Sequence, residues 1–274
     1  MPDRKPSEPP WTDPAYLRDV QYADDRNLAA RQSIYAYSDR AVDLPREVIA
    51  SLNLAGNEIV IDVGCGNGAY LAEFAKRGHA GRVAGVDLSP GMLKASGTRA
   101  PRTGLLVGDA ARLPLADVAS DVTLAMHMLY HVPDRPAAVG ELRRVTRPGG
   151  MVVIGLNGDD HLAELRAIIN IELRSSGLSA GHAVQERIRL DDGEVMLRRA
   201  FGAVTRHDLT GRLRLPDPQP VTDYVLSMGL GRRPADQQRL AAAVASRLDF
   251  GIDGSFTVTT HCGWLICTDE ERPG

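Results

Sequence analysis

The chain has 274 residues, a hydrophobic content of 43%, a charged content of 24% and a formal net charge of −3. These values are ordinary for a globular protein of one domain with elaborations, and the dispersed basic residues do not indicate a nucleic-acid partner. Residues 1–10 are polar and rich in proline, and no apolar run approaches the length of a membrane span, so we expect a cytoplasmic protein without a membrane partner.

The three cysteines, Cys65, Cys262 and Cys267, lie in apolar surroundings. An odd number of cysteines in such contexts indicates buried, reduced thiols rather than a disulfide or a metal site. Cys262 and Cys267 would also point to opposite faces of a strand, which makes them a poor pair of metal ligands. We therefore expect no metal.

The first predicted elements are helical. Residues 1–14 have the composition of a flexible tail, whereas residues 16–37 carry aromatic and aliphatic side chains at helical spacing. Two interpretations of this stretch stay open. It is either a lid helix that packs on the core, or a helix from which Tyr22 and Arg31 reach a cofactor, with Arg31 pairing with the cofactor's carboxylate. Residues 43–54 form a second, amphipathic helix.

A glycine-rich turn follows these helices. The apolar residues 59–61 lead into Asp62 and then into Gly64, Gly66 and Gly68. Such a sequence is typical of a buried strand that turns sharply into a helix. Glycines allow the backbone to approach a ligand closely and tolerate a positive φ. We interpret the turn as the binding loop of a nucleotide-type cofactor.

Two cofactors fit such a loop, and Asp62 decides between them. Gly64, Gly66 and Ala69 satisfy the loose dinucleotide pattern, and Asp87 lies where a ribose-binding carboxylate is expected. A pyrophosphate, however, requires backbone N–H groups without a competing negative charge. S-adenosylmethionine carries a sulfonium and an ammonium but no phosphate, so the carboxylate attracts it. The loop therefore favours S-adenosylmethionine over NAD.

Acidic residues also follow the next two predicted strands, at 82–87 and 104–107. Asp87 ends the first of these strands. Ligands of a doubly wound sheet bind at the carboxyl ends of its strands, so Asp87 is expected to reach ribose hydroxyls. Asp109 follows the second strand and can accept the amino group of adenine, while Ala110 offers a backbone N–H.

Strand and helix patterns alternate from residue 59 to residue 157, which predicts a doubly wound, mainly parallel sheet. Ser89 with the proline after it indicates the start of a helix from which Met92 faces back toward the site. The other elements expected here are helices at 69–77 and 137–145, strands at 121–126 and 151–156, and a break at 147–150.

Two histidines follow the fourth strand, directly after Met126. His127 and His131 are four residues apart and share one face if this segment is helical. His131 is the first candidate for a general base, with a capping or packing role as the alternative, and His127 is expected to form a wall beside the cofactor. His161 and Asn157 are further candidates to face the acceptor.

The alternation of patterns loosens after residue 157, and no second domain is indicated. We expect helices at 160–174, 191–201, 222–227 and 234–248, a sixth strand at 204–209 with an extension to 215 left open, a last strand at 255–268, and a proline-rich loop at 216–220. The last strand has alternating apolar residues and is expected to pair antiparallel. The predicted organisation is a tail with lid helices at 1–56 and a seven-stranded domain at 57–274, with acceptor-site helical insertions at about 158–202 and 216–254.

Several motifs of this chain occur together: Asp62-x-Gly64-x-Gly66-x-Gly68, Asp87, Gly108-Asp109-Ala110, and His131-Val132-Pro133-Asp134 followed by Arg147-Pro148-Gly149-Gly150. In this combination the chain resembles class I S-adenosylmethionine-dependent methyltransferases. The most similar subgroup is related to the ubiquinone and menaquinone biosynthesis methyltransferases and contains many natural-product methyltransferases. The resemblance covers residues 59–157 and implies a Rossmann-like fold with a helical lid.

The resemblance also implies roles for individual residues. It places Asp62 and the backbone of Gly64, Cys65 and Gly66 around the methionine part of the cofactor, Asp87 at the ribose, Leu88 and Met92 beside adenine, Asp109 and Ala110 at the adenine edge, and His127 at the methyl-transfer site. The predicted cofactor site is completed by Tyr22, Arg31 and Met126.

The sequence thus favours an S-adenosylmethionine-dependent methyltransferase, releasing S-adenosylhomocysteine, that acts as a monomer or homodimer on a small secondary-metabolite or quinone-like acceptor. Oxygen is favoured over nitrogen and carbon as the methylated atom. This preference comes from the breadth of the family and not from any residue of this chain. RNA or protein methylation would require an extended basic surface. An NAD-dependent oxidoreductase is disfavoured by Asp62 and by the lack of a Tyr-x-x-x-Lys pair. A non-catalytic partner subunit is disfavoured by the intact loop.

Overall fold

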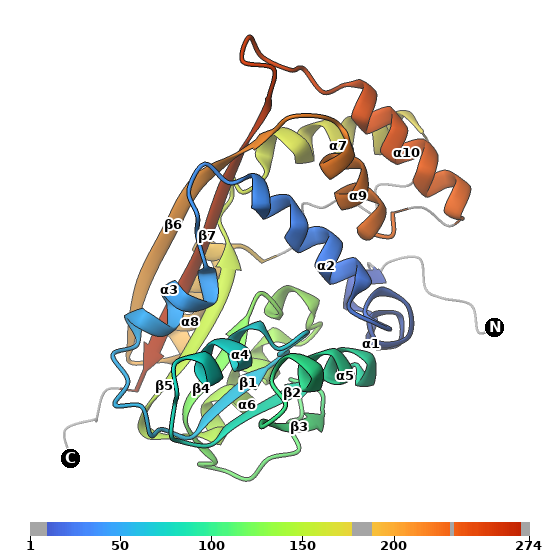
Figure 1. Ribbon diagram of the computed structural model, residues 1–274. Helices are drawn as coiled ribbons and strands as arrows, with labels where there is room; N and C mark the ends of the chain where they lie inside the picture. Colours follow the sequence, from blue (N-terminus) through green and yellow to red (C-terminus); the bar gives the residue numbers. More distant parts are fainter. Residues whose placement is uncertain (1–9, 177–187, 231–232, 270–274) are drawn as a thin grey trace.

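A computed structural model describes residues 10–176, 188–230 and 233–269. Seven strands of these ranges form one sheet in the order β3-β2-β1-β4-β5-β7-β6 (Figure 1). The strands are β1 (Val60–Val63), β2 (Val83–Asp87), β3 (Gly104–Val107), β4 (Ser120–Met126), β5 (Thr146–Asn157), β6 (Ala203–Leu215) and β7 (Phe256–Thr268).

The sheet is parallel from β1 to β5, and only β7 runs antiparallel to its neighbours β5 and β6. The predicted fold, a doubly wound and mainly parallel sheet with an antiparallel last strand, is confirmed. The helices are α1 (Pro14–Tyr16), α2 (Arg26–Ser33), α3 (Leu44–Ser51), α4 (Ala69–Lys76), α5 (Pro90–Arg99), α6 (Arg135–Val145), α7 (Ala163–Ser175), α8 (Leu190–Ala200), α9 (Gln219–Ser227) and α10 (Pro234–Ser246).

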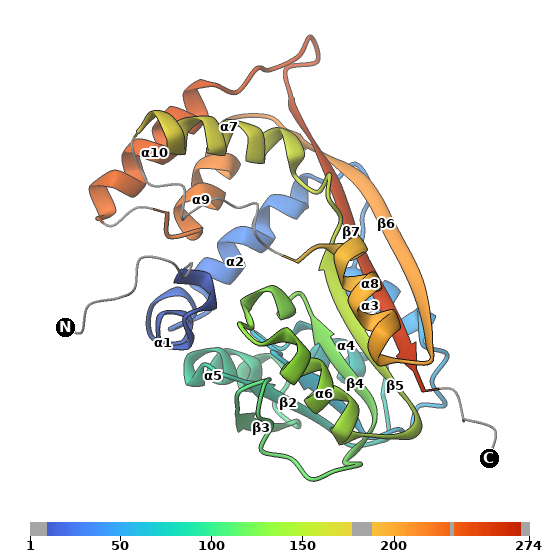
Figure 2. The ribbon, with the colours of Figure 1, turned by 180° about the vertical axis from the view of Figure 1, so that it is seen from behind.

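Helices cover both faces of the sheet (Figures 1 and 2). On one face α3 and α4 pack on the centre of the sheet, where Phe74 and Leu124 belong to one buried cluster. On the other face α6 and α8 pack on it, with Leu142 and Leu197 in a second cluster. Burial of apolar side chains at about 25 cal/mol per Å² is the main force that holds these layers together.

A third hydrophobic cluster joins α7, α9 and α10 to the far ends of β6 and β7. Figures 1 and 2 show these three helices together at one end of the molecule, with α2 running beneath them. Ile34, just after α2, is fully buried in the same cluster. The predicted helical lid is therefore built from α2 together with these three helices. In the described ranges, no helix has both the length and the apolar character that crossing a bilayer requires.

The N-terminal segment differs from its prediction. The single helical stretch expected at 16–37 is broken into α1, a π-helical turn at Leu17–Gln21, α2 and a 3-10 turn at Ile34–Tyr37. The predicted tail is also wrong for residues 10–14, because Trp11 is buried and Asp13 caps α1. Residues 1–9 lie outside the described ranges. Local spacing suggested one helix, but packing on two different surfaces bends the chain.

Two predicted breaks are shorter than expected. Residues 147–150 lie inside β5 as an irregularity of register, because Thr146 already pairs with Ser120 before Met151 pairs with Val122. The proline-rich loop at 216–220 ends early, since α9 begins at Gln219. Its proline occupies the second helical position, where a missing N–H costs nothing.

The helices of the first predicted insertion, at about 158–202, lie in two different places, because α8 packs on the sheet whereas α7 joins the helices of the second insertion. Residues of α8 belong to the cluster beneath the sheet, so this helix completes the core of the domain. By contrast, α7, α9 and α10 lie beyond the carboxyl end of β5. Only this second group is placed where it can cover a site at the strand ends.

Candidate functional site

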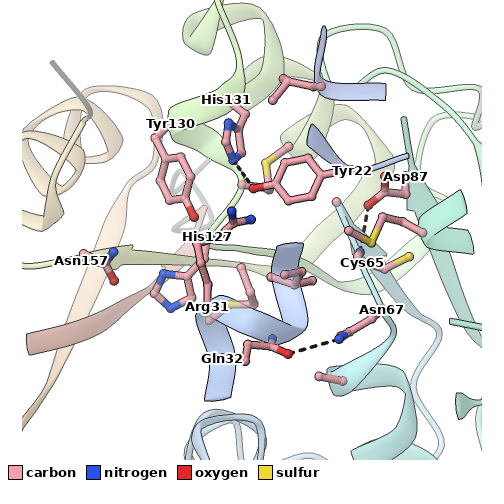
Figure 3. A pocket seen from close by; sticks show the side chains of 18 of the residues that line it. Tyr22, Arg31, Gln32, Cys65, Asn67, Asp87, His127, Tyr130, His131 and Asn157 are labelled. Carbon is pink, nitrogen blue, oxygen red and sulfur yellow. Dashed lines mark hydrogen bonds between the residues drawn. The ribbon is translucent and has the colours of Figure 1, made fainter. Parts of the chain in front are cut away.

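A cavity of about 950 Å³ opens at the carboxyl ends of β1, β2, β4 and β5. The glycine turn lines it with Cys65 and Asn67, and the segment from Trp11 to Leu44, called the N-terminal wall below, lines it with Tyr22, Arg31 and Gln32 among others (Figure 3). Tyr224 of α9 also lines it. Single small-ligand sites span roughly 300–1,000 Å³, so this volume accommodates a cofactor and a small acceptor together. All the predicted site residues line this cavity: Tyr22, Arg31, Asp62, Gly64, Cys65, Gly66, Asp87, Leu88, Met92, Asp109, Ala110, Met126, His127 and His131.

The glycine turn has the backbone geometry that its sequence predicts. Gly64 and Gly66 have φ values of 70° and 53°, in the left-handed region that favours glycine. A Cβ at Gly64 would lie 2.7 Å from Cβ of Met128, which belongs to the loop after β4. The close approach of that loop therefore also requires glycine. The amide of Asn67 donates to Oε1 of Gln32 at 3.1 Å and ties the turn to the N-terminal wall.

Asp62 is the most unusual group of the site. Its side chain is 1% exposed, and neither carboxylate oxygen has a hydrogen-bond partner in the part of the chain that the structure describes. Burial, together with the negative charge of Asp87, raises the pKa of Asp62 well above its ordinary value. An isolated buried carboxylate is costly unless a cation pairs with it, so this position is suited to a positively charged ligand group.

Asp87 is held by the glycine turn itself. Its two carboxylate oxygens accept hydrogen bonds from the backbone N–H groups of Gly66 at 2.8 Å and Ser89 at 2.9 Å. Burial raises the pKa of Asp87, and these N–H groups oppose the rise. The carboxylate is thus fixed at the carboxyl end of β2, with acceptor capacity left for ligand hydroxyls.

The N-terminal wall contributes a cation. Nη1 of Arg31 donates to the carbonyl of Ser227 at 2.8 Å, while Nη2 is buried and has no partner within residues 10–176, 188–230 and 233–269. The guanidinium lies 5.2 Å from the ring centroid of Tyr22, a cation–π distance. Nε2 of Gln21 donates to the same Ser227 carbonyl at 2.9 Å, so one peptide group of α9 anchors this wall at two points.

These orphaned groups fit the methionine end of S-adenosylmethionine. That end carries an ammonium and a carboxylate, and the cavity offers a buried carboxylate at Asp62 and an unpaired donor at Arg31. Ribose hydroxyls and an adenine amino group are matched by Asp87 and by the exposed Asp109. A pyrophosphate has no cationic group for Asp62, in agreement with the preference inferred from the sequence.

Comparisons with known proteins agree with this geometry. Residues 61–154 match the family described as a methyltransferase domain. An uncharacterized methyltransferase of Mycobacterium tuberculosis is 30% identical over 204 residues, which cover 74% of this chain and 77% of that protein.

The chain belongs to the S-adenosylmethionine-dependent methyltransferases. A malonyl-[acyl-carrier protein] O-methyltransferase of Serratia marcescens is 37% identical over 131 residues, covering 46% of this chain and 51% of the relative. This methyltransferase therefore spans about half the length of that and similar curated relatives. A solved structure of a putative methyltransferase from Bacillus halodurans has the same fold, with a TM-score of 0.60, 18% identity, and coverage of 83% of this chain and 99% of that chain.

The two predicted histidines both line the cavity, but not on a helix face. His127 has a φ of 54°, and only Leu129–His131 form a 3-10 turn. The expectation of one shared helical face is therefore wrong. Pro133 disfavours the helical conformation of the residue before it, and the left-handed residue at 127 breaks the chain on the other side.

His131 has both ring nitrogens engaged. Nδ1 lies 2.9 Å from the carbonyl oxygen of Trp11, and Nε2 lies 2.8 Å from the hydroxyl of Tyr22 (Figure 3). A carbonyl oxygen only accepts, so in the neutral ring Nδ1 carries the proton and Nε2 accepts from Tyr22. His131 is therefore reached from the cavity through Tyr22. His127 differs, because burial lowers its pKa to about 4 and keeps its ring neutral.

The sequence did not point to the tyrosines of this methyltransferase as a group. Six of its seven tyrosines line the cavity: Tyr16, Tyr22, Tyr35, Tyr70, Tyr130 and Tyr224. The scarcity of phenylalanine beside seven tyrosines was a signal, since a tyrosine combines an apolar ring with a polar tip. His161, a secondary candidate, lines the same region with Asn157 and Cys262.

Proposed function

We propose that this methyltransferase binds S-adenosylmethionine between the glycine turn and the N-terminal wall and methylates a small secondary-metabolite or quinone-like acceptor. Oxygen is the favoured target atom, ahead of nitrogen and carbon. The observation that carries the proposal is the pair of unpartnered buried groups, the Asp62 carboxylate and Nη2 of Arg31, on one cavity. No group of the described residues satisfies either one, and the two ends of a bound amino acid would satisfy both.

The residues that would hold the cofactor follow from their chemistry. Asp62 pairs with its ammonium and Arg31 with its carboxylate. Asp87 accepts from the ribose hydroxyls. The adenine is flanked by Leu88 and Met92, and its edge is held by Asp109 and Ala110. Bound there, S-adenosylmethionine supplies an electrophilic methyl group.

The proton that an acceptor hydroxyl or amine loses on methylation has a defined route. The hydroxyl of Tyr22 takes this proton while its own proton passes to Nε2 of His131. The imidazolium that forms keeps its Nδ1–H on the Trp11 carbonyl, which stabilises the added charge. Proximity of the acceptor to the methyl group and exclusion of water supply the rest of the rate enhancement.

A small acceptor is supported by the way the cavity is covered. The N-terminal wall and α9 line its far side, and the chain has a net charge of −3. An RNA acceptor would require an extended basic surface, and a folded protein would have to enter beneath the wall. The relative from Serratia marcescens is named as an O-methyltransferase, which supports oxygen as the favoured atom.

Calorimetric titration tests the cofactor assignment. S-adenosylmethionine and S-adenosylhomocysteine are expected to bind and NADH is not. Asp62→Ala and Arg31→Gln should each weaken binding about tenfold or more, while Arg26→Gln, an exposed change on the same helix, should not. Tight NADH binding with no response to the other two ligands contradicts the proposal.

Labelled methyl transfer tests the acceptor class. The purified enzyme and methyl-labelled S-adenosylmethionine are added to an extract of the native cells, which is then separated into small-molecule, RNA and protein fractions. The label is expected in the small-molecule fraction. Label confined to RNA or protein would establish the alternative, a macromolecular methyltransferase.

A further inference from the structure

Two tyrosine–histidine pairs face this cavity, and they come from different parts of the fold. Tyr22 is bonded to His131 in the loop after β4, at 2.8 Å. Tyr35 is bonded to Nε2 of His161 in the loop after β5, at 2.9 Å. Both tyrosines belong to the N-terminal wall, and all four residues line the cavity. The pairs look equivalent, but their hydrogen bonds run in opposite directions.

The direction in the first pair is set by a carbonyl group. Nδ1 of His131 lies 2.9 Å from the Trp11 carbonyl, which only accepts, so Nδ1 carries the proton of the neutral ring. Nε2 is then an acceptor, and the hydroxyl of Tyr22 donates to it. The lone pairs of the Tyr22 oxygen remain for a ligand. This pair presents a hydrogen-bond acceptor to the cavity.

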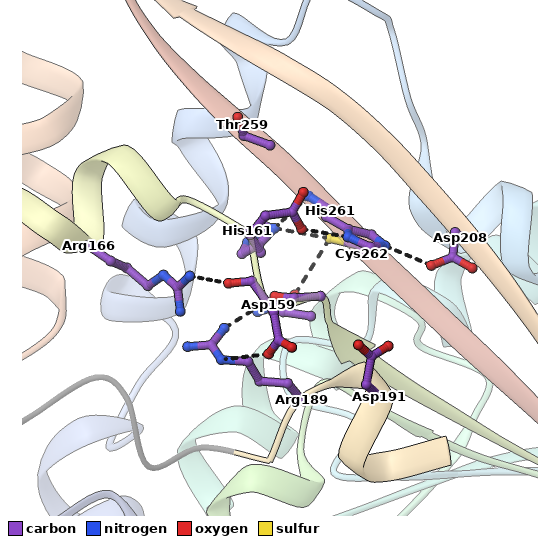
Figure 4. A network of polar contacts seen from close by, with 12 residues as sticks. Asp159, His161, Arg166, Arg189, Asp191, Asp208, Thr259, His261 and Cys262 are labelled. Carbon is purple, nitrogen blue, oxygen red and sulfur yellow. Dashed lines mark hydrogen bonds and ion pairs between the residues drawn. The ribbon is translucent and has the colours of Figure 1, made fainter. Parts of the chain in front are cut away.

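The direction in the second pair is set by a backbone N–H. The amide of His261 donates to Nδ1 of His161 at 3.0 Å, so Nδ1 carries no proton (Figure 4). Burial lowers the pKa of His161 to about 3, in agreement with a neutral ring. Nε2 must therefore carry the proton and donate it to the Tyr35 oxygen. The hydroxyl proton of Tyr35 then has no acceptor among the described residues and is available to a ligand.

The His261 amide is itself firmly placed. His261 lies on β7, its carbonyl accepts from the backbone N–H of Gly158 at 2.9 Å, and its ring lies between the carboxylates of Asp160 and Asp208 (Figure 4). The ring of His161 is 5% exposed and nearly parallel to that of Tyr35, with an interplanar angle of 24°. The donor direction of Tyr35 is thus fixed by the sheet.

The two pairs also sit toward different ends of the site. The carbonyl of Tyr22 accepts from the Ser89 hydroxyl at 2.6 Å, next to the Asp87 region of the cofactor site. Tyr35 is tied through His161 to β7 and to the loop after β5. A molecule that contacts both tyrosines therefore has one group near the cofactor and another near β5 and β7.

We infer that the acceptor substrate has two functional groups. One is a hydroxyl or amine that donates its hydrogen to Tyr22 and becomes methylated. The other is a carbonyl or carboxylate oxygen that accepts the hydroxyl proton of Tyr35. This inference rests on the proposed function for the identity of the methylated group, whereas the opposite direction of the two pairs rests on the hydrogen bonds alone.

Nitrogen-15 NMR of the histidine rings tests the directions without any cofactor or acceptor. The spectra are recorded at about pH 8.5, well above the ordinary histidine pKa of about 6.5, so that the tautomers of neutral rings are compared. His161 is expected to carry its proton on Nε2 and His131 on Nδ1. His131→Gln and His161→Gln assign the two signals. The same tautomer in both rings would overturn the inference.

Binding of matched probes tests the second functional group. The probes are 2-, 3- and 4-hydroxyacetophenone and the corresponding ethylphenols, titrated in the presence of S-adenosylhomocysteine. At least one ketone should bind about three- to tenfold more tightly than its ethyl counterpart, the effect of one hydrogen bond. This preference should vanish in Tyr35→Phe and persist in Tyr37→Phe, whose tyrosine does not line the cavity.

The outcomes separate the two proposals. Equal or undetectable binding of all ketones and ethylphenols, in protein that binds S-adenosylhomocysteine, overturns the second functional group and leaves the proposed function standing. A preference for ketone that Tyr35→Phe retains also overturns it. Absence of S-adenosylhomocysteine binding counts against the proposed function. In that case the probes are titrated without it, and the same preference for ketones is expected. The two results named above would again overturn the second functional group.

Discussion

Asp62 is the last residue but one of β1 and Asp87 ends the neighbouring parallel strand β2, and the charge of Asp87 adds to burial in raising the pKa of Asp62. Because the folded state holds the Asp62 proton more tightly than the unfolded state, ionisation of this carboxyl costs stability as the pH rises above about 3.9. The ligand-free protein therefore contains a destabilising group at neutral pH. Its cost is removed when a cation binds beside it.

The first prediction concerns Asp62→Asn. In the ligand-free protein this change should raise the free energy of unfolding at pH 7 by about 1 kcal/mol, or the melting temperature by about 2–4 °C, with a smaller gain near pH 5. S-adenosylmethionine should stabilise the wild type and leave the variant nearly unchanged. Thermal unfolding with and without the cofactor measures both effects. A ligand-free variant less stable than the wild type would refute this account.

The second prediction concerns Gly64→Ala. The added Cβ meets Met128 at 2.7 Å in a backbone with a φ of 70°, so it should destabilise the fold by roughly 1–3 kcal/mol. Gly140→Ala, at an exposed position of α6, is the control, because nothing lies within 4 Å of the Cβ that it adds. That change should stabilise by about 0.5–1 kcal/mol. Denaturant unfolding compares the two, and equal effects would contradict the close packing of the loops.

The third prediction concerns the pH dependence of His261. Burial lowers the pKa of this ring, but hydrogen bonds to Asp208 and Asp160 outweigh it, and the net pKa is raised. A raised histidine pKa stabilises the fold below about pH 6.5, and this contribution is lost as the pH rises through the folded value. His261→Asn should therefore lose more stability at pH 6 than at pH 9. The difference between the two losses should be about 1 kcal/mol or less, because Asp160 and Asp208 are solvated.

Chemical denaturation of wild type and variant at both pH values provides the measurement. His207→Asn on the adjacent strand serves as a control for the loss of a histidine, since its ring stacks on Trp264 and has no carboxylate partner in the described chain. If His261→Asn lost more stability at pH 9 than at pH 6, the result would contradict a raised pKa of His261 between Asp160 and Asp208.

The fourth prediction concerns the Tyr22–His131 pair. With the acceptor that the labelling experiment identifies, His131→Ala and Tyr22→Phe should each lower kcat about 10²-fold or more. Affinity for the cofactor should change much less in His131→Ala, because the imidazole contacts the Tyr22 hydroxyl and the Trp11 carbonyl. The double variant should be little slower than either single one, since the proton passes through both groups. Unchanged turnover in His131→Ala removes the pair from the mechanism.

Much of the fold was predictable because its signals are local. The strands from residue 60 to residue 126 were placed to within about one residue, since apolar runs and glycine turns mark them directly. Most of the predicted site residues followed from one rule, that loops after parallel strands meet at one edge. Tyr22 and Arg31 came instead from one of the two interpretations of the N-terminal helical stretch, and all the predicted residues line the cavity. The bend at Tyr22 and the irregularity inside β5 depend on partners far away in the chain, so local patterns did not show them.

The direction of the hydrogen bonds was beyond sequence reasoning for a similar reason. His131 and His161 look alike in the sequence, and their tautomers differ because one ring meets a carbonyl and the other an N–H. Those backbone groups belong to Trp11 and His261, which lie 120 and 100 residues away along the chain. Only the assembled fold brings them to the rings.

The carbonyl of Ser227, which receives both Gln21 and Arg31, has a kinetic consequence. Two anchor points on one peptide group cannot be released one after the other by movement of α9, because the same displacement lengthens both bonds. We therefore expect the N-terminal wall and α9 to separate together when α9 moves. Since Arg31 also faces the bound methionine end in the proposed complex, we expect the departure of the spent cofactor to be coupled to the opening of the wall, and such coupling makes product release a candidate for the slow step of turnover.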